Sequence, residues 1–199
     1  MSQVIISISR EYGSGGREIA EKLSERFGIA YYDKNILDHI AEDKEADSEE
    51  LKKYDEKSAN PLFYRNVMGY SNSPHDNIAL MQFEKMQDMA KNGESFVILG
   101  RCSEDILSGT PGFVAIFVNG DSPDKIKRIA ERNGLGEEEA EKRMKKISRD
   151  RRRYHNRYCG TKWGDSRNSD ITVNSSRLGI DKTVDVLEYF IREKCNLPK

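Results

Sequence analysis

Residues 4–28 contain a strand pattern, a glycine-rich turn and an amphipathic helix in direct succession. Val4 to Ile8 is a short run of mostly β-branched apolar residues, typical of a strand that is buried on both faces of a parallel sheet. Three glycines follow within four positions, at Gly13, Gly15 and Gly16. The next segment places apolar side chains on one helical face, namely Ile19, Ala20, Leu23 and Phe27. This order predicts an α/β fold, because strand, tight turn and helix form the first part of a βαβ crossover.

The glycine turn has the features of an anion site. Backbone N–H groups at a helix start point toward a bound phosphate, and glycine permits positive φ and close approach. The residues expected to bind the phosphates of ATP are Gly13, Ser14, Gly15, Gly16, Arg17 and Glu18. An ordinary glycine turn in an α/β protein is the alternative.

The turn departs from the common phosphate-loop pattern, G-x-x-x-x-G-K-[ST]. Arg10 stands in place of the first glycine, and Gly16 stands in place of the lysine. Arg17 is the nearest cation, and we expect it to replace the missing lysine. The alternative is that Arg17 points to solvent and pairs with Glu21, four residues along the helix.

Composition favours one globular domain. A chain of 199 residues can bury a core, and 36% of its residues are hydrophobic against 34% charged. The formal net charge of −1 argues against a general nucleic-acid or membrane binder. No apolar stretch approaches the roughly 20 residues that span a bilayer, and the N-terminus has no signal-peptide profile. The three cysteines and three histidines lack the spacing of a disulfide framework or a metal site, so we expect a cytoplasmic protein without protein-bound metal.

The rest of the chain alternates between strand and helix patterns. Further strands are expected at residues 29–32, 95–99, 113–118 and 171–173. Helices are expected at residues 33–42, 79–90, 121–133, 137–157 and 180–191. Residues 43–75 are polar and are interpreted as an inserted helical or mobile lobe. This alternation predicts a parallel sheet covered on both faces, with ligands at the carboxyl ends of its strands.

The helix expected at residues 137–157 carries a stripe of cations. A 4-3-4-4 spacing places Lys142, Lys146, Arg149, Arg153 and Arg157 along one helical face. Like charges at such spacings repel by about 0.2–0.5 kcal/mol per pair, so a visiting phosphate explains the stripe best. The alternatives are a merely basic surface helix and an RNA-binding helix that uses the aromatic residues nearby. Those residues are Tyr154, Tyr158 and Trp163.

Two further candidate sites lie where predicted strands end. Arg101 follows one apolar run, and Asp33 and Lys34 follow another. Because strand ends face the ligand crevice in such sheets, we expect Arg101 to point toward the bound phosphates. A structural Arg101 paired with Glu104 or Asp105 is the alternative, and Asp33 by itself also fits a helix cap.

In this order, the motifs resemble the cytidylate kinase-like family, a branch of the nucleoside-monophosphate kinases with the phosphate-loop fold. The resemblance extends from about Val4 to Ile191. It is carried by the segments I-S-I-S-R-E-Y-G-S-G-G-R-E, Y-Y-D-K, I-L-G-R, R-D-R-R-R-Y-H-N-R and D-I-T-V-N-S-S-R-L-G-I. It implies one kinase-like domain over residues 1–199, with an acceptor-binding helical insertion at about 34–93 and an arginine-rich lid at about 137–165.

The resemblance also implies transfer of the γ-phosphoryl group of ATP, with Mg²⁺, to a nucleoside monophosphate or a related small acceptor. The expected catalytic residues are Arg17, Arg101, Arg149, Arg153 and Arg157. The expected acceptor-binding residues are Asp33, Lys34 and Arg101. A non-catalytic nucleotide-binding sensor is the alternative, because the loop lacks both the lysine and the hydroxyl that follows it in the common pattern.

Overall fold

The computed structural model describes residues 3–44, 49, 66–67, 70–71 and 74–198. Its main sheet has five parallel strands in the order β2-β5-β1-β6-β7. These strands are β1 (Ile5–Arg10), β2 (Ala30–Tyr32), β5 (Phe96–Leu99), β6 (Phe113–Asn119) and β7 (Ile171–Asn174). All of the predicted strands are present, and β1 extends to Arg10. Because β1 is central, the loop that follows it leaves the middle of the carboxyl edge.

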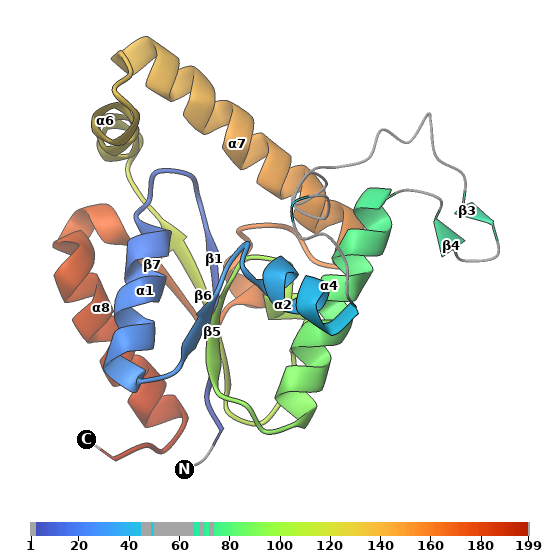
Figure 1. The fold of residues 1–199 in the computed structure, drawn as a ribbon. Coiled ribbons are helices and arrows are strands. Elements are labelled where there is room, and N and C mark those ends of the chain that lie inside the picture. The colour runs from blue at the N-terminus through green and yellow to red at the C-terminus, as the bar shows by residue number, and fades with distance from the viewer. Residues whose placement is uncertain (1–2, 45–48, 50–65, 68–69, 72–73, 199) are drawn as a thin grey trace.

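Helices cover both faces of the sheet (Figure 1). On one face, α1 (Gly16–Phe27) and α8 (Ser175–Lys194) pack against the side of β1 that carries Ile6 and Ile8. On the other face, Ile5 belongs to the core formed with α2 (Ile36–Lys44), α4 (Pro74–Lys91) and the short α5 (Ser103–Ile106). This burial on both faces explains why the strands appear in the sequence as continuous apolar runs.

Two helices extend beyond the carboxyl edge of the sheet. α6 (Ser122–Asn133) and α7 (Glu137–Tyr158) share a small core of Ile129, Ala140 and Met144, against which Tyr12 packs. The C-terminal end of α7 returns to the main body, where Tyr154 belongs to the core that includes α4 residues. In Figure 1, α7 therefore spans the top of the molecule from α6 to α4. A 3₁₀ helix at Ser166–Asn168 follows it.

The lobe predicted at residues 43–75 lies mostly outside the described residues. Within this range, β3 (Asn66–Val67) and β4 (Tyr70–Ser71) form an antiparallel ribbon that the sequence analysis did not predict. Two residues per strand are too few to show a period, which explains the omission. α4 also begins at Pro74, earlier than predicted, with proline at its first position as is common in helices. None of the described helices is long and apolar enough to cross a bilayer.

Candidate active site

The glycine loop, residues 11–15, connects β1 to α1. Gly13 and Gly15 have φ angles of 87° and 78°, and Gly15 is the N-terminal cap of α1. A Cβ at Gly13 would lie 2.9 Å from the carbonyl oxygen of Lys125, so glycine is required there for space as well as for conformation. The first N–H groups of any helix lack intrahelical acceptors. The loop therefore presents backbone donors and the positive end of α1 at one place, as an anion site requires.

Neighbouring helices hold the carbonyl groups of this loop. Arg128 of α6 donates to the carbonyl oxygen of Gly13 at 2.6 Å, and the Ser175 hydroxyl donates to that of Ser14, also at 2.6 Å. Ser14 itself is fully buried, and its hydroxyl donates to the carbonyl oxygen of Glu11 at 3.0 Å. These bonds fix the path of the loop. The sequence analysis did not identify Arg128 or Ser175, because each lies more than a hundred residues from the loop.

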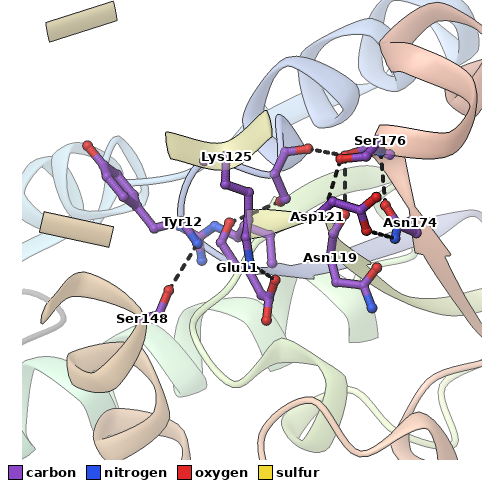
Figure 2. A network of polar contacts seen from close by, with 12 residues as sticks. Glu11, Tyr12, Asn119, Asp121, Lys125, Ser148, Asn174 and Ser176 are labelled. Carbon is purple, nitrogen blue, oxygen red and sulfur yellow. Dashed lines mark hydrogen bonds and ion pairs between the residues drawn. The ribbon is translucent and has the colours of Figure 1, made fainter. Parts of the chain in front are cut away.

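The loop also contacts α6 and α7 through side chains (Figure 2). Lys125 of α6 forms an ion pair with Glu11 at 2.5 Å, and the N–H of Tyr12 donates to Ser148 of α7 at 3.3 Å. Arg151 of α7 donates to the backbone carbonyl oxygen of Arg10 at 3.2 Å, and its guanidinium lies over the Tyr12 ring. The helix that the family resemblance identifies as a lid is thus bonded to the loop that it is expected to cover.

Beside the loop, Asp33 contacts three arginines from three elements. Asp33 follows β2 and is 7% exposed. Arg17 of α1 forms an ion pair with one of its carboxylate oxygens. Arg101, which follows β5, is 3.4 Å from the other oxygen, and Arg10 at the end of β1 is 4.0 Å from the same one. The structure thus brings together Arg17, Asp33 and Arg101, which the sequence analysis identified separately, and adds Arg10.

The ion pairs of Arg17 and Arg101 differ from the alternatives that the sequence analysis left open. Within the described residues, Arg101 pairs with Asp33 and not with Glu104 or Asp105. Arg17 likewise pairs with Asp33 instead of pointing away to Glu21. Burial disfavours the charged Arg17 guanidinium, but the Asp33 carboxylate, together with Tyr31 and Glu21, outweighs that effect and raises the pKa of Arg17 above its usual value. Such a cluster offers several planar donors, which suit phosphate oxygens.

Arg101 is held in an unusual backbone conformation. Gly100, Arg101 and Cys102 have consecutive positive φ angles of 77°, 64° and 56°. Left-handed conformations at two non-glycine residues are costly, and strain of this kind is common at functional sites. The Arg101 side chain is fully buried, so this turn directs a charged group into the protein interior beside Asp33.

The cationic stripe on α7 is divided by acidic partners. Lys142 pairs with Glu138 at 2.6 Å, one helical turn earlier. Arg157 forms two hydrogen bonds, of 2.9 and 2.7 Å, to the buried carboxylate of Asp76 on α4, and Tyr158 donates to the same group. Acidic side chains therefore neutralise the predicted stripe at both of its ends. Sequence spacing on one helix could not show Asp76, which tertiary packing brings to α7.

The middle of the stripe remains exposed. Arg153 is 3.9 Å from Asp150, and within the described residues no ion pair is recorded for Lys146 or Arg149. Lys34 and Glu18 are also exposed. That these exposed residues bind ATP or the acceptor remains a prediction.

The aromatic residues near the stripe are packed against the protein. Tyr154 is 6% exposed and belongs to a core cluster, Tyr158 is bonded to Asp76, and Trp163 meets the Phe117 ring edge-on at 5.4 Å between centroids. Stacking on bases needs exposed ring faces. The packing therefore disfavours the interpretation of α7 as an RNA-binding helix.

Comparisons with known proteins agree on family and fold. The model of the cytidylate kinase-like family matches residues 5–177. Cytidylate kinase of Methanopyrus kandleri is 24% identical over 197 residues, which cover 94% of this chain and 93% of that protein. An uncharacterized protein of Eubacterium ventriosum, solved by crystallography, is 37% identical with a TM-score of 0.76, covering 95% of this chain and 98% of its own. Shikimate kinase of Bacteroides thetaiotaomicron has a TM-score of 0.54 at 14% identity, with 95% and 98% covered. The predicted phosphate-loop kinase fold is confirmed.

Proposed function

This chain belongs to the cytidylate kinase-like family, and from that premise we propose that it transfers the γ-phosphoryl group of ATP to a nucleoside monophosphate. Cytidylate is the first acceptor to test, because the curated relative that matches almost the whole chain is a cytidylate kinase. The observation that carries the proposal is the convergence of Arg10, Arg17 and Arg101 on Asp33, beside the glycine loop.

In this proposal the protein positions two anions and stabilises the charge that moves between them, which is most of what phosphoryl transfer demands. Backbone N–H groups from Gly13 to Arg17 hold the phosphates of ATP. Arg17 turns from Asp33 to the transferred phosphoryl group and supplies the charge of the missing lysine. Arg101 holds the acceptor phosphate, while Asp33 keeps both arginines oriented before the substrates bind.

The lid residues have different parts in this proposal. Arg149 and Arg153 lie on the exposed part of α7 and reach the phosphates when the lid closes. Arg157 anchors the base of the lid, because its guanidinium is bonded to Asp76. Lys34, exposed beside Asp33, assists the acceptor.

The described residues around the loop do not form a magnesium site of the common kind. Position 17 carries no hydroxyl, and the nearby carboxylates of Glu11 and Asp33 are paired with Lys125 and Arg17. Mg²⁺ usually retains several waters and binds largely through substrate phosphates. We therefore assign no protein ligand to Mg²⁺ within the described residues and treat the ion as part of the ATP substrate.

The experiment is an acceptor screen on the purified chain with ATP and Mg²⁺. ADP formation is measured with CMP, dCMP, UMP, AMP and GMP in turn, and nucleotide binding is measured in parallel by calorimetry. We expect transfer to CMP to be fastest. Arg101→Lys should reduce kcat/KM for the acceptor and leave ATP affinity unchanged, because lysine cannot replace the planar fork. Binding of ATP without transfer to any of these acceptors would favour the sensor alternative, for which the altered loop is the supporting observation.

A further inference from the structure

A second group of reactive side chains lies beneath the end of α7. Cys102, His155 and Cys159 come from two separate segments, and their potential ligand atoms all lie within 4.8 Å of one another. Their exposures are 3%, 4% and 9%, so the group is almost closed to solvent. His155 lies in the last turn of α7, and Cys159 is the C-cap residue that follows the helix, with its backbone N–H bonded to the carbonyl oxygen of His155. Cys102 lies in the strained turn after β5.

The spacing of these donors suits a tetrahedral metal ion. Zn²⁺ binds cysteine sulfur at about 2.3 Å and histidine nitrogen at about 2.0–2.1 Å, which places ligand atoms about 3.5–3.8 Å apart. Ligand atoms that now lie within 4.8 Å need to approach by at most about 1 Å. Two soft sulfurs with one imidazole favour Zn²⁺ over hard ions such as Mg²⁺ or Ca²⁺.

The histidine of this group has the partner that a metal-bound histidine requires. Glu104 accepts a hydrogen bond from His155 Nδ1 at 3.1 Å and another from the Ser9 hydroxyl at 2.7 Å. A carboxylate on one ring nitrogen fixes the tautomer and orients the other nitrogen toward a metal. His155 Nε2 now contacts the Thr161 hydroxyl at 3.1 Å and would exchange that contact for the ion.

The surroundings leave room and a polar atom for a fourth ligand. A cavity of about 20 Å³ is lined by Cys102, Glu104 and His155 on one side and by Arg10, Arg101 and Arg151 among its other residues, and a water molecule needs only about 10–15 Å³. Glu104 Oε2 is buried and has no hydrogen-bond partner within the described residues.

We propose that Cys102, His155 and Cys159 bind a Zn²⁺ ion, with water or Glu104 Oε2 in the fourth position. On binding, the two thiols release their protons and His155 coordinates as neutral imidazole. The ion joins the turn that carries Arg101 to the end of α7, so it anchors the base of the lid. The site adjoins the proposed active site, because the cavity beside it is also lined by Arg10, Arg101 and Arg151, but none of its three ligands has a part in the proposed phosphoryl transfer.

The experiment titrates the reduced full-length chain with Zn²⁺ and with Co²⁺. We expect one Zn²⁺ per chain by elemental analysis. Co²⁺ should give a thiolate-to-cobalt charge-transfer band and the visible bands of a tetrahedral complex. Zn²⁺ should also raise the Tm, because it binds the folded chain.

Variants then assign the ligands. Cys159→Ser and His155→Gln should abolish the charge-transfer band or weaken Zn²⁺ binding by at least about 100-fold, and Glu104→Gln should weaken it by about 10–100-fold. Cys195→Ser is the matched control, because Cys195 is the third free cysteine and lies outside the cluster, and it should bind like wild type. Circular dichroism of each metal-free variant checks that it is folded.

The wild-type measurements keep the proposal testable even if a variant fails to fold. Absence of a thiolate-to-cobalt band in the wild type overturns the proposal. So does a disulfide between Cys102 and Cys159 that forms in place of metal binding, detected as the loss of two hydrogens by mass spectrometry. Zn²⁺ binding that survives Cys159→Ser, or that is lost in Cys195→Ser, also overturns it.

Discussion

Arg10 and Gly16 flank the glycine loop and lie so close together that the Arg10 side chain leaves no room for a side chain at position 16. A Cβ built on Gly16 would lie 2.6 Å from the Cβ of Arg10 and 3.0 Å from its Cγ. Arg10 stands where the common loop has glycine, and Gly16 stands where it has lysine. The two departures are therefore one steric arrangement, in which an arginine at the end of β1 requires glycine at the start of α1.

We expect Gly16→Ala to lower the free energy of unfolding by about 1–3 kcal/mol, because the overpacking outweighs the usual helix gain of alanine over glycine. Arg10→Gly should relieve that cost in the double variant, whereas Arg10→Ala should not, because alanine keeps the Cβ. The coupling energy is obtained from urea unfolding of the single and double variants. Gly136→Ala is the control, since a Cβ there meets open space. Additive effects of Arg10→Gly and Gly16→Ala would contradict this account.

Arg17→Ala should lower kcat for phosphoryl transfer by about 10²–10³, if Arg17 supplies the charge that the loop lysine normally provides. Arg17→Lys should retain part of the activity. Lys22→Ala on the same helix is the control, because Lys22 pairs with the exposed Asp181 at 2.9 Å. The measurement is steady-state transfer with saturating ATP. Equal, small effects of Arg17→Ala and Lys22→Ala would exclude Arg17 from catalysis.

Asp76→Asn should loosen the C-terminal end of α7, the helix that we propose as the lid. The substitution weakens two charge-assisted hydrogen bonds from Arg157 and the bond from Tyr158, at a cost of about 1–3 kcal/mol. Hydrogen exchange in the last turns of α7 should become faster. Asp150→Asn is the control, because its contact with the exposed Arg153 is 3.9 Å and is worth about 0–1 kcal/mol. Unchanged exchange in α7 would show that Asp76 does not anchor the lid.

Tyr31 should make the fold sensitive to alkaline pH. Burial, with a contribution from the Asp33 carboxylate, raises the pKa of Tyr31 to about 12 from its ordinary value of 10.0. Below pH 10 the phenol is neutral in both folded and unfolded chains. Above that pH the unfolded chain ionises first, so stability falls as pH rises from about 10 through 12, by at most about 2 kcal/mol.

Tyr31→Phe should remove this part of the pH dependence. It should also stabilise the protein at neutral pH by about 1 kcal/mol, because the Tyr31 hydroxyl is buried without a hydrogen-bond partner in the described part of the chain. Urea unfolding at a series of pH values gives both quantities. Tyr189→Phe, at a position 64% exposed, is the control and should follow wild type. A parallel pH dependence in Tyr31→Phe and wild type would refute the assignment.

Local patterns in the sequence were sufficient for the strands of the main sheet and for the position of the glycine loop. A strand buried on both faces requires a continuous apolar run, and the runs from Val4, Ser95 and Phe113 became β1, β5 and β6. A turn with positive φ requires glycine, which identified Gly13 and Gly15. These features depend on residues close together in the chain, so the sequence alone contains the information that determines them.

Contacts between distant segments were decided by the tertiary structure. Asp33 fitted a simple helix cap in the sequence, and only the order β2-β5-β1 brings Arg101 and Arg10 to it. The partner of Arg157 is Asp76, which lies 81 residues earlier and on another helix. The cluster of Cys102, His155 and Cys159 has no regular ligand spacing, because one ligand comes from the turn after β5 and two from the end of α7. Side-chain charge and chemistry are properties of each residue, but which charges meet depends on how the sheet orders its strands and how the helices cross it.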